Sequence, residues 1–278
     1  MKIGIVGKGF VGNAMYENFK DKFEVKSYDL NPEKSDVGSI AELVNWAETL
    51  FVCVPTPSNE DGSCDIAMVE SVVDMISFVD KSKTVVLKST VPPGTTRRLS
   101  EQYGIKIAFN PEFLTEANSI ADFKHQPLIV VGADDEETEI KVWQIYYKYV
   151  SATGYMPNMM GAKTDEAEMF KYMANAFLAT KVIFANEMKV LCDKVGIDYN
   201  SVARIAKTDR RLGHSHWQVP GPDGKLGFGG SCFPKDTDGL VAFADSHDAT
   251  LWLLTEACYI NQEIRDDVQF SKFKLVME

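Results

Sequence analysis

The sequence lacks several features that would each indicate a particular class of protein. No apolar run approaches the roughly 18 residues that a membrane-spanning helix needs. The first residues, MKIGIVGKGF, carry no basic leader ahead of a long apolar core. The five cysteines form no CxxC pair, so neither a zinc ribbon nor a disulfide framework is supported. These absences predict a cytoplasmic protein that does not act in a membrane.

Positive charge is also scarce in this chain. Its 29 Lys and Arg residues are outnumbered by 40 Asp and Glu residues, which gives a net charge of -11. Nonspecific nucleic-acid binding needs a basic surface, so nucleic acid is not expected as a partner. No metal site is predicted either, because His214 and His216 share a loop rich in glycine and proline with no third ligand nearby.

The pattern of apolar runs predicts an α/β fold. Strand-like runs occupy residues 2–6, 23–28, 50–54, 84–87, 105–109 and 128–131, with helical stretches between most of them. Such alternation is typical of a Rossmann-type parallel sheet with helical crossovers. After about residue 150 we expect helices only, including a long one over 163–194 and a final one from about 249 to the end. The predicted domains are therefore 1–150, with the parallel sheet, and 151–278, all-helical.

A glycine motif follows the first predicted strand. Gly7-Lys8-Gly9-Phe10-Val11-Gly12 opens a helix, and Asp29 ends the next strand. This is the dinucleotide-binding fingerprint, in which the glycines let the backbone approach a pyrophosphate and the acid bonds the adenosine ribose. The Asp29 carboxylate would repel a 2′-phosphate, so NAD is predicted rather than NADP. The alternative is a glycine-rich turn that binds no ligand.

Two further sets of residues suggest catalysis. Lys171 and Asn175 are four apart on the long helix and share a face, where they could hold a substrate oxygen as negative charge develops. In GFGGSCFPKD, residues 227–236, Cys232 stands near an expected helix start, which favours a thiolate nucleophile. The alternatives are a surface lysine and a structural, buried cysteine.

The chain resembles the UDP-glucose/GDP-mannose dehydrogenase family. The resemblance extends over nearly the whole chain, and the matching segments follow one another in the same order as in the family. The segments that carry it are GKGFVG at 7–12, CVPTP at 53–57, KSTVPPGTT at 88–96, NPEFLTEANSIADF at 110–123, AEMFKYMANAFLATKVIFANE at 167–187, DRRLG at 209–213 and GFGGSCFPKD. It implies an NAD-dependent enzyme that oxidises the C6 alcohol of a nucleotide sugar twice, with UDP-glucose as the expected substrate.

The resemblance also implies roles for individual residues. Cys232 matches the nucleophile, and Lys171 and Asn175 match the groups that stabilise the oxyanion. Asp236, with Thr90, matches the pair that orients a water or a proton-transfer group, and Glu116 matches an acid of thioester hydrolysis that also contacts the cofactor. Further matches are cofactor contacts at Lys34, Pro55, Thr56, Thr90 and Lys235, and substrate contacts at Glu112, Phe113, Leu114, Phe228 and Gly229. Alternatively, Glu112 or Glu116 could be a solvated surface carboxylate with no role in the site, and Asp236 could be only a helix cap.

The chain departs from the family in its length and in one loop. Family members continue through a second α/β domain that covers the nucleotide, so this sequence is expected to be a natural short form or part of a longer protein. Arg211 matches an arginine that reaches the neighbouring subunit's site, and helices 163–194 and 249–276 are expected to form a homodimer interface. The loop between Gly213 and Gly227 is longer than usual; Trp217 could stack there on a base, or the loop could be an exposed turn.

Other functions remain open on the sequence alone. A second nucleotide-sugar 6-dehydrogenase, acting on GDP-mannose or a UDP-N-acetylhexosamine, would share these residues. A β-hydroxyacid dehydrogenase would share the Lys171–Asn175 helix, but its single oxidation needs no Cys232. A truncated binding protein that has lost turnover would keep the cofactor site alone.

Overall fold

The computed structural model describes residues 1–268, which cluster into two compact units. The first unit contains Met1–Pro57 and Asp65–Lys171. The second contains Ser58–Cys64 and the chain from Tyr172 onward. The long helix α7 (Thr164–Val195) therefore begins in the first unit and ends in the second.

The first unit is built on a seven-stranded sheet in the order β2-β1-β3-β4-β5-β6-β7. Its strands are β1 (Lys2–Val6), β2 (Glu24–Tyr28), β3 (Thr49–Val52), β4 (Thr84–Leu87), β5 (Lys106–Phe109), β6 (Leu128–Gly132) and β7 (Asn158–Ala162). All neighbours pair in parallel except β5 and β6, which are antiparallel at Phe109 and Gly132. The predicted α/β class, with a Rossmann-type and mostly parallel sheet, is confirmed.

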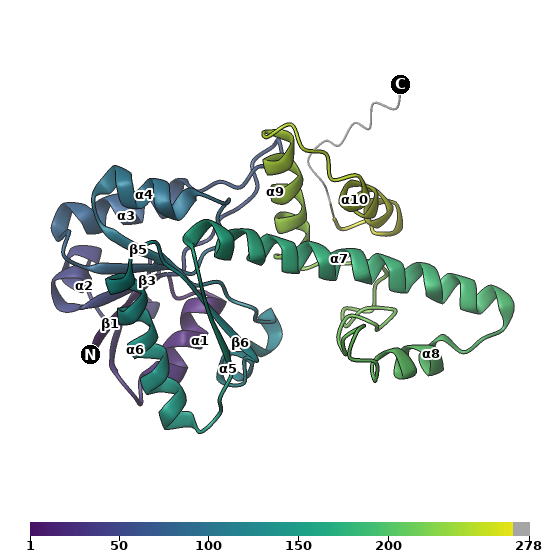
Figure 1. The fold of residues 1–278 in the computed structure, drawn as a ribbon, viewed down its shortest axis with the longest axis horizontal. Coiled ribbons are helices and arrows are strands. Elements are labelled where there is room, and N and C mark those ends of the chain that lie inside the picture. The colour runs from purple at the N-terminus through teal and green to yellow at the C-terminus, as the bar shows by residue number, and fades with distance from the viewer. Residues whose placement is uncertain (269–278) are drawn as a thin grey trace. The chain divides into compact units, whose positions relative to one another are not determined.

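Helices cover both faces of this sheet (Figure 1). One face packs α2 (Ile40–Trp46), α3 (Ala67–Val79) and α4 (Thr95–Tyr103). The other packs α1 (Phe10–Phe19), α5 (Ser119–Lys124) and α6 (Glu136–Thr153). Successive strand residues alternate between the two cores: Leu50 and Val52 of β3 join the first, and Phe51 joins the second. Both faces are buried, which explains why these strands read as continuous apolar runs.

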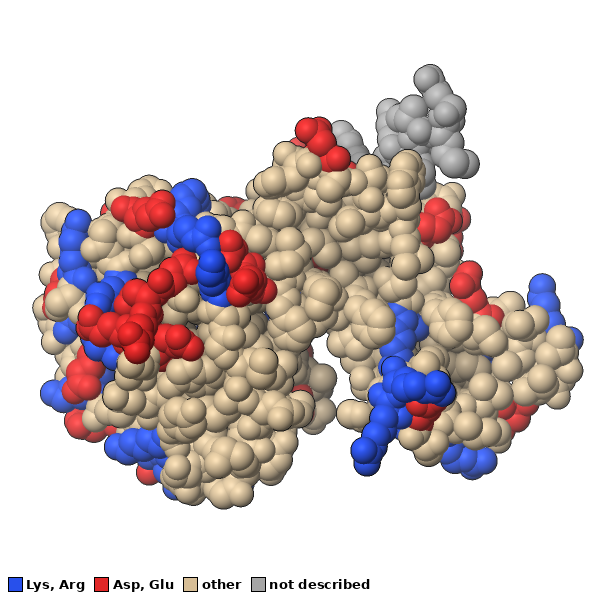
Figure 2. Space-filling model, viewed as in Figure 1, with Lys and Arg blue, Asp and Glu red and all other residues tan. Residues whose placement is uncertain are grey.

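Most charged side chains of the first unit lie on its surface. Figure 2 shows acidic and basic groups intermingled there rather than separated. Many of them are paired, as in Arg98–Glu70 at 2.5 Å and Arg97–Asp165 at 2.8 Å. Exposed pairs of this kind each contribute less than about 1 kcal/mol to stability, so they do not determine the fold.

The second unit is helical. After α7 come α8 (Tyr199–Ala206), α9 (Phe233–Asp245) and α10 (Trp252–Ile264). Two apolar clusters hold it together: one joins Tyr172 and Ala179 to Leu240 and Leu254, and the other surrounds Tyr199 and Trp217.

Two expectations from the sequence were wrong. A strand, β7, follows residue 150; the sequence pattern did not predict it, because only Met159 and Ala162 of NMMGA are even partly buried. The last helix ends at Ile264 and not at the chain end, because Arg265 adopts an extended backbone and is buried among polar partners. The predicted helical residues 269–276 lie outside the described part of the chain. The helix start expected near Cys232 is found: α9 begins at Phe233, which makes Cys232 its N-cap residue.

Candidate active site

The three glycines in the turn between β1 and α1 have different surroundings. Gly7 has φ +87°, and a Cβ on it would lie 2.8 Å from the carbonyl oxygen of Cys53. A Cβ on Gly12 would lie 1.9 Å from the carbonyl oxygen of Gly7. At Gly9, by contrast, a Cβ would meet nothing within 4 Å, and this residue is the N-cap of α1 without a side-chain cap. The loop thus leaves open space where the first amides of a helix begin, which suits a pyrophosphate.

Asp29 follows β2 with its carboxylate fixed by backbone amides. It accepts hydrogen bonds from the N–H groups of Lys8 at 2.6 Å and Asn31 at 2.9 Å. Beside it is a depression of about 360 Å³ that Asp36 and Glu42 also line. Three carboxylates around one depression favour a ribose hydroxyl over a 2′-phosphate. Lys34 lies close in sequence, in an exposed 3₁₀ turn over Pro32–Lys34, but does not line this depression.

The loops after β3 and β4 are joined by a buried hydrogen bond. Thr56 Oγ1 donates to the carbonyl oxygen of Thr90 at 2.9 Å, and both residues are buried. Pro55, next to Thr56, is exposed. These residues follow the carboxyl ends of adjacent parallel strands, where open α/β sheets bind their ligands.

Lys171 and Glu112 form a buried ion pair in the first unit. Lys171 Nζ lies 2.9 Å from Glu112 Oε1 and 2.7 Å from the carbonyl oxygen of Glu112, while the N–H of Leu114 donates to Glu112 Oε2 at 2.6 Å. Burial alone would raise the pKa of Glu112, but Lys171 and these hydrogen bonds outweigh it, so the pKa is lowered. Phe113 packs edge-on against Phe170, with its ring centroid 5.5 Å from Lys171 Nζ. The pair therefore keeps a charged ammonium in an apolar setting.

Two buried groups that our sequence analysis left without a role support this pair. Lys88 Nζ donates to Asn110 Oδ1 at 2.7 Å and to the carbonyl oxygen of Asn110 at 3.0 Å, two residues before Glu112. Burial lowers the pKa of Lys88 to about 8. Glu168, one turn before Lys171, accepts hydrogen bonds at the start of α4 from the N–H of Gly94 at 2.6 Å and the N–H of Thr96 at 2.8 Å. Lys88 is an isolated charge after an apolar run, which is a sequence signal of a role, whereas Glu168 lies among other charged residues and carries no such signal.

The second unit gathers three of the predicted catalytic residues, and the predicted cofactor contact Lys235, around the start of α9. Asn175 Nδ2 donates to Asp236 Oδ2 at 2.6 Å, and Lys235 Nζ forms an ion pair with the other carboxylate oxygen. Asp236 is buried, and its N–H donates to the carbonyl oxygen of Cys232 at 2.8 Å, closing the first turn of the helix. Cys232 itself is half-buried at the N-cap, where the helix favours negative charge. A potential nucleophile thus lies one turn from a fixed carboxylate.

Two models of one family match consecutive parts of this chain. The NAD binding domain of the UDP-glucose/GDP-mannose dehydrogenase family matches residues 36–150, and the family's central domain matches residues 165–263. The chain belongs to the UDP-glucose/GDP-mannose dehydrogenase family. The predicted resemblance is thereby confirmed. The glycine loop and Asp29 precede the matched residues, but they follow β1 and β2, which belong to the same sheet as the matched strands.

Individual relatives agree with this assignment. A UDP-glucose 6-dehydrogenase of Rickettsia felis is 34% identical over 90% of this chain and 55% of its own length. The structure of a UDP-glucose dehydrogenase from Pyrobaculum islandicum matches with a TM-score of 0.83 and 30% identity, over 94% of this chain and 68% of that one. A 3-hydroxyisobutyrate dehydrogenase of Mycobacterium tuberculosis, at 20% identity and a TM-score of 0.76 over 96% of this chain and 94% of that one, shares the fold. The chain spans about half the length of the curated relatives it matches.

The other residues carried over from the dehydrogenase family lie in varied surroundings. Glu116 is exposed in a 3₁₀ turn, and Arg211 is exposed with its guanidinium 2.7 Å from Asp209. Phe228 is buried in the core of the second unit, so a ligand would meet its backbone rather than its ring. Trp217 is buried too, and its indole N–H donates to the carbonyl oxygen of Gly213 at 2.9 Å. Base stacking on Trp217 would require its loop to open.

Residues 1–268 contain neither a metal-binding cluster nor a membrane-spanning helix. Within residues 1–268, no cluster of three His, Cys, Asp or Glu side chains has the arrangement of a metal site. The described helices also include none that is both long and apolar enough to cross a membrane.

Proposed function

We propose that this chain catalyses the NAD-dependent oxidation of the C6 alcohol of a nucleotide sugar to a carboxylate, with UDP-glucose as substrate. The observation that carries the proposal is Cys232 at the N-cap of α9, one turn from the Asn175–Asp236 pair. A single hydride transfer makes no use of a thiol, whereas a second oxidation at the same carbon is eased by a thiohemiacetal formed on sulfur. The curated relatives' names support the substrate.

The overall reaction balances as one alcohol, two NAD⁺ and one water giving one carboxylate, two NADH and three protons. NAD, when bound, accepts the hydride in each oxidation. Asp236, directly or through water, would receive the proton of the C6 hydroxyl in the first step. The Cys232 thiolate would then add to the aldehyde carbon, and loss of the second hydride would leave a thioester on sulfur. Water would hydrolyse that thioester and release the thiol, with Glu116 as the predicted acid of this step.

Lys171 and Asn175 are proposed to stabilise the oxyanions of these steps. They lie one turn apart on α7, so the helix itself fixes their spacing. Each is already oriented by a carboxylate, Lys171 by Glu112 and Asn175 by Asp236. Donors that are oriented before the reaction lower the barrier more than donors that must reorganise.

The test is the number of NADH molecules formed per sugar consumed, measured at 340 nm with limiting substrate. A panel of UDP-glucose, GDP-mannose and UDP-N-acetylhexosamines identifies the sugar. Two NADH per UDP-glucose would support the proposal. One NADH, on a small hydroxyacid, would favour the β-hydroxyacid alternative, and binding of NAD without turnover of any substrate would favour a binding protein.

We also propose a homodimer formed through α7. Five apolar side chains at helical spacing are at least half exposed along it: Met173, Phe177, Phe184, Leu191 and Val195. An apolar stripe of this length on a water-facing helix is typical of an interface. Light scattering on the purified chain tests this, with Phe177→Glu/Phe184→Glu expected to give a monomer. A monomeric unmodified chain would refute it.

A further inference from the structure

The glycine loop that leads to Cys232 is clamped by a side-chain amide from α10. Asn261, which is fully buried, accepts a hydrogen bond from the N–H of Phe228 at 2.7 Å and donates one to the carbonyl oxygen of Phe228 at 2.9 Å. One amide therefore satisfies both backbone polar groups of a single residue. Phe228 lies four residues before Cys232, so this clamp fixes the chain just ahead of the nucleophile.

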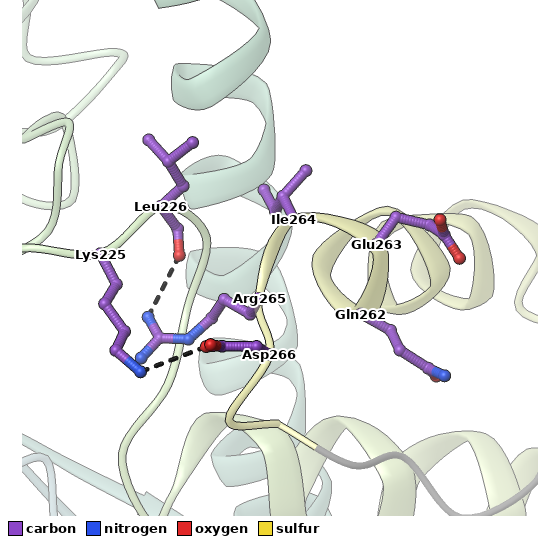
Figure 3. Close-up of a pocket in the computed structure, with 7 residues that line it drawn as sticks. All are labelled: Lys225, Leu226, Gln262, Glu263, Ile264, Arg265 and Asp266. Atoms are coloured by element: carbon purple, nitrogen blue, oxygen red, sulfur yellow. Dashed lines mark hydrogen bonds and ion pairs between the residues drawn. The ribbon is translucent and has the colours of Figure 1, made fainter.

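Arg265, which ends α10 one turn later, makes a second contact with the same loop. Its guanidinium donates to the carbonyl oxygen of Leu226 at 3.2 Å, as Figure 3 shows. It also lies directly against Gly229, where a Cβ would come within 2.5 Å of Nη2 and 2.6 Å of Cζ. Asp223 at 2.6 Å and Asp267 at 2.9 Å balance its buried charge. The guanidinium thus occupies the volume that any side chain at position 229 would need.

A third contact comes from α7. Asn186 Oδ1 accepts a hydrogen bond from the N–H of Gly227 at 3.1 Å, and Asn186 Nδ2 donates to the carbonyl oxygen of Val182 at 2.7 Å, which fixes its orientation. Gly227 has φ +68° and Gly230 has φ +78°, both in the left-handed region. A segment with three glycines has large backbone freedom when unrestrained. The contacts from Asn186, Asn261 and Arg265 therefore restrict its conformation.

We propose that Asn261 and Arg265 are positioning residues for Cys232. They hold Leu226–Gly229 in one conformation and thereby fix the position of the Cys232 sulfur. The inference rests on the proposed role of Cys232 as nucleophile. A displacement of about 1 Å at a reacting group can cost about 100-fold in rate, so a loosened loop would reduce catalysis without removing any reacting atom.

The first experiment measures loop order without any turnover. The full chain is treated with iodoacetamide, and modification of the peptide containing Cys232 is followed by mass spectrometry. Asn261→Ala and Arg265→Lys should each raise the alkylation rate at Cys232 about fivefold, the effect of losing a net hydrogen bond from the closed loop. Gln262→Ala, an exposed neighbour on α10, is the matched control and should change the rate less than about twofold.

Circular dichroism establishes which variants are folded, and Arg265→Lys keeps the proposal testable if Asn261→Ala does not fold. A merely structural role would lower the melting temperature of the folded variants but leave alkylation at Cys232 unchanged. Unchanged alkylation in every folded clamp variant would overturn the proposal.

The second experiment is a double-mutant cycle between Gly229 and Arg265, read by alkylation and by kcat/KM. On its own, Gly229→Ala should strongly raise the alkylation rate at Cys232 and lower kcat/KM, because its methyl group meets the guanidinium. In an Arg265→Ala background the same change should have a smaller effect, since the space is then free. Equal effects in both backgrounds would mean that Gly229 acts through another contact and would overturn the role of Arg265. If the chain turns over no nucleotide sugar, the proposed function fails, while the alkylation data still decide the clamp.

Discussion

The buried pair of Lys171 and Glu112 allows stability and catalysis to be separated by mutation. Lys171→Met would remove the ammonium and leave the Glu112 carboxylate buried without its counter-charge, although the N–H of Leu114 would still bond it. Breaking a buried pair on one side typically costs about 3–5 kcal/mol. Both side chains are less than a tenth exposed, so we expect a loss in that range in the free energy of unfolding at pH 7.

The double variant Lys171→Met/Glu112→Gln should recover most of that stability, because no uncompensated charge remains. It should not recover turnover, since the proposed oxyanion donor is still absent. Urea unfolding gives the stabilities, and NADH formation gives the activity. If the double variant were as unstable as Lys171→Met, the electrostatic explanation would be refuted. If it were active at the unmodified rate, Lys171 would have no catalytic role.

The Lys171–Glu112 pair should make the free energy of unfolding decrease at low pH. The pKa of Glu112 is lowered in the folded chain, so its contribution to stability is present above the unfolded value of about 4.5. That contribution should be lost as the pH falls through the lower, folded pKa. In Lys171→Met this acid-side loss should shrink, and urea unfolding at a series of pH values below 5 measures it.

Three further predictions concern other residues. Cys232→Ser should stop the reaction after at most the first oxidation, so limiting UDP-glucose would yield no more than one NADH per sugar; a wild-type rate with two NADH would refute the nucleophile assignment. Gly12→Ala would place a methyl group 1.9 Å from the carbonyl oxygen of Gly7 and should abolish NAD binding in calorimetry. Gly154→Ala, at the C-cap of α6 with a φ of +70°, should lower stability but leave binding intact. Burial raises the pKa of Glu168 from 4.5 to about 7, so its contribution to stability is full below pH 4.5 and falls by about 3 kcal/mol as the pH rises through 7. Glu168→Gln should remove this slope from a pH series of urea unfolding, and an unchanged slope would assign it to another group.

The sequence by itself determined the fold class, and it predicts where the chemistry lies along the chain. Apolar runs separated by helical patterns are a direct consequence of burying both faces of a parallel sheet, which is why β1 to β6 could be read from it. The glycines at 7, 9 and 12 and the acid at 29 are likewise a local pattern, because one turn and one strand end build that part of the site.

Only the tertiary structure decided which side chains meet. The Lys171–Glu112, Asn175–Asp236 and Asn261–Phe228 contacts join residues 59, 61 and 33 positions apart, and no local pattern encodes such pairings. It also decided burial and pairing: Trp217 lies in a core although its loop reads as polar, and β7 pairs with β6 although most residues of β7 are exposed. Packing and long-range hydrogen bonds outweigh local propensity at these positions, since each is stabilised by groups that the chain brings near only on folding.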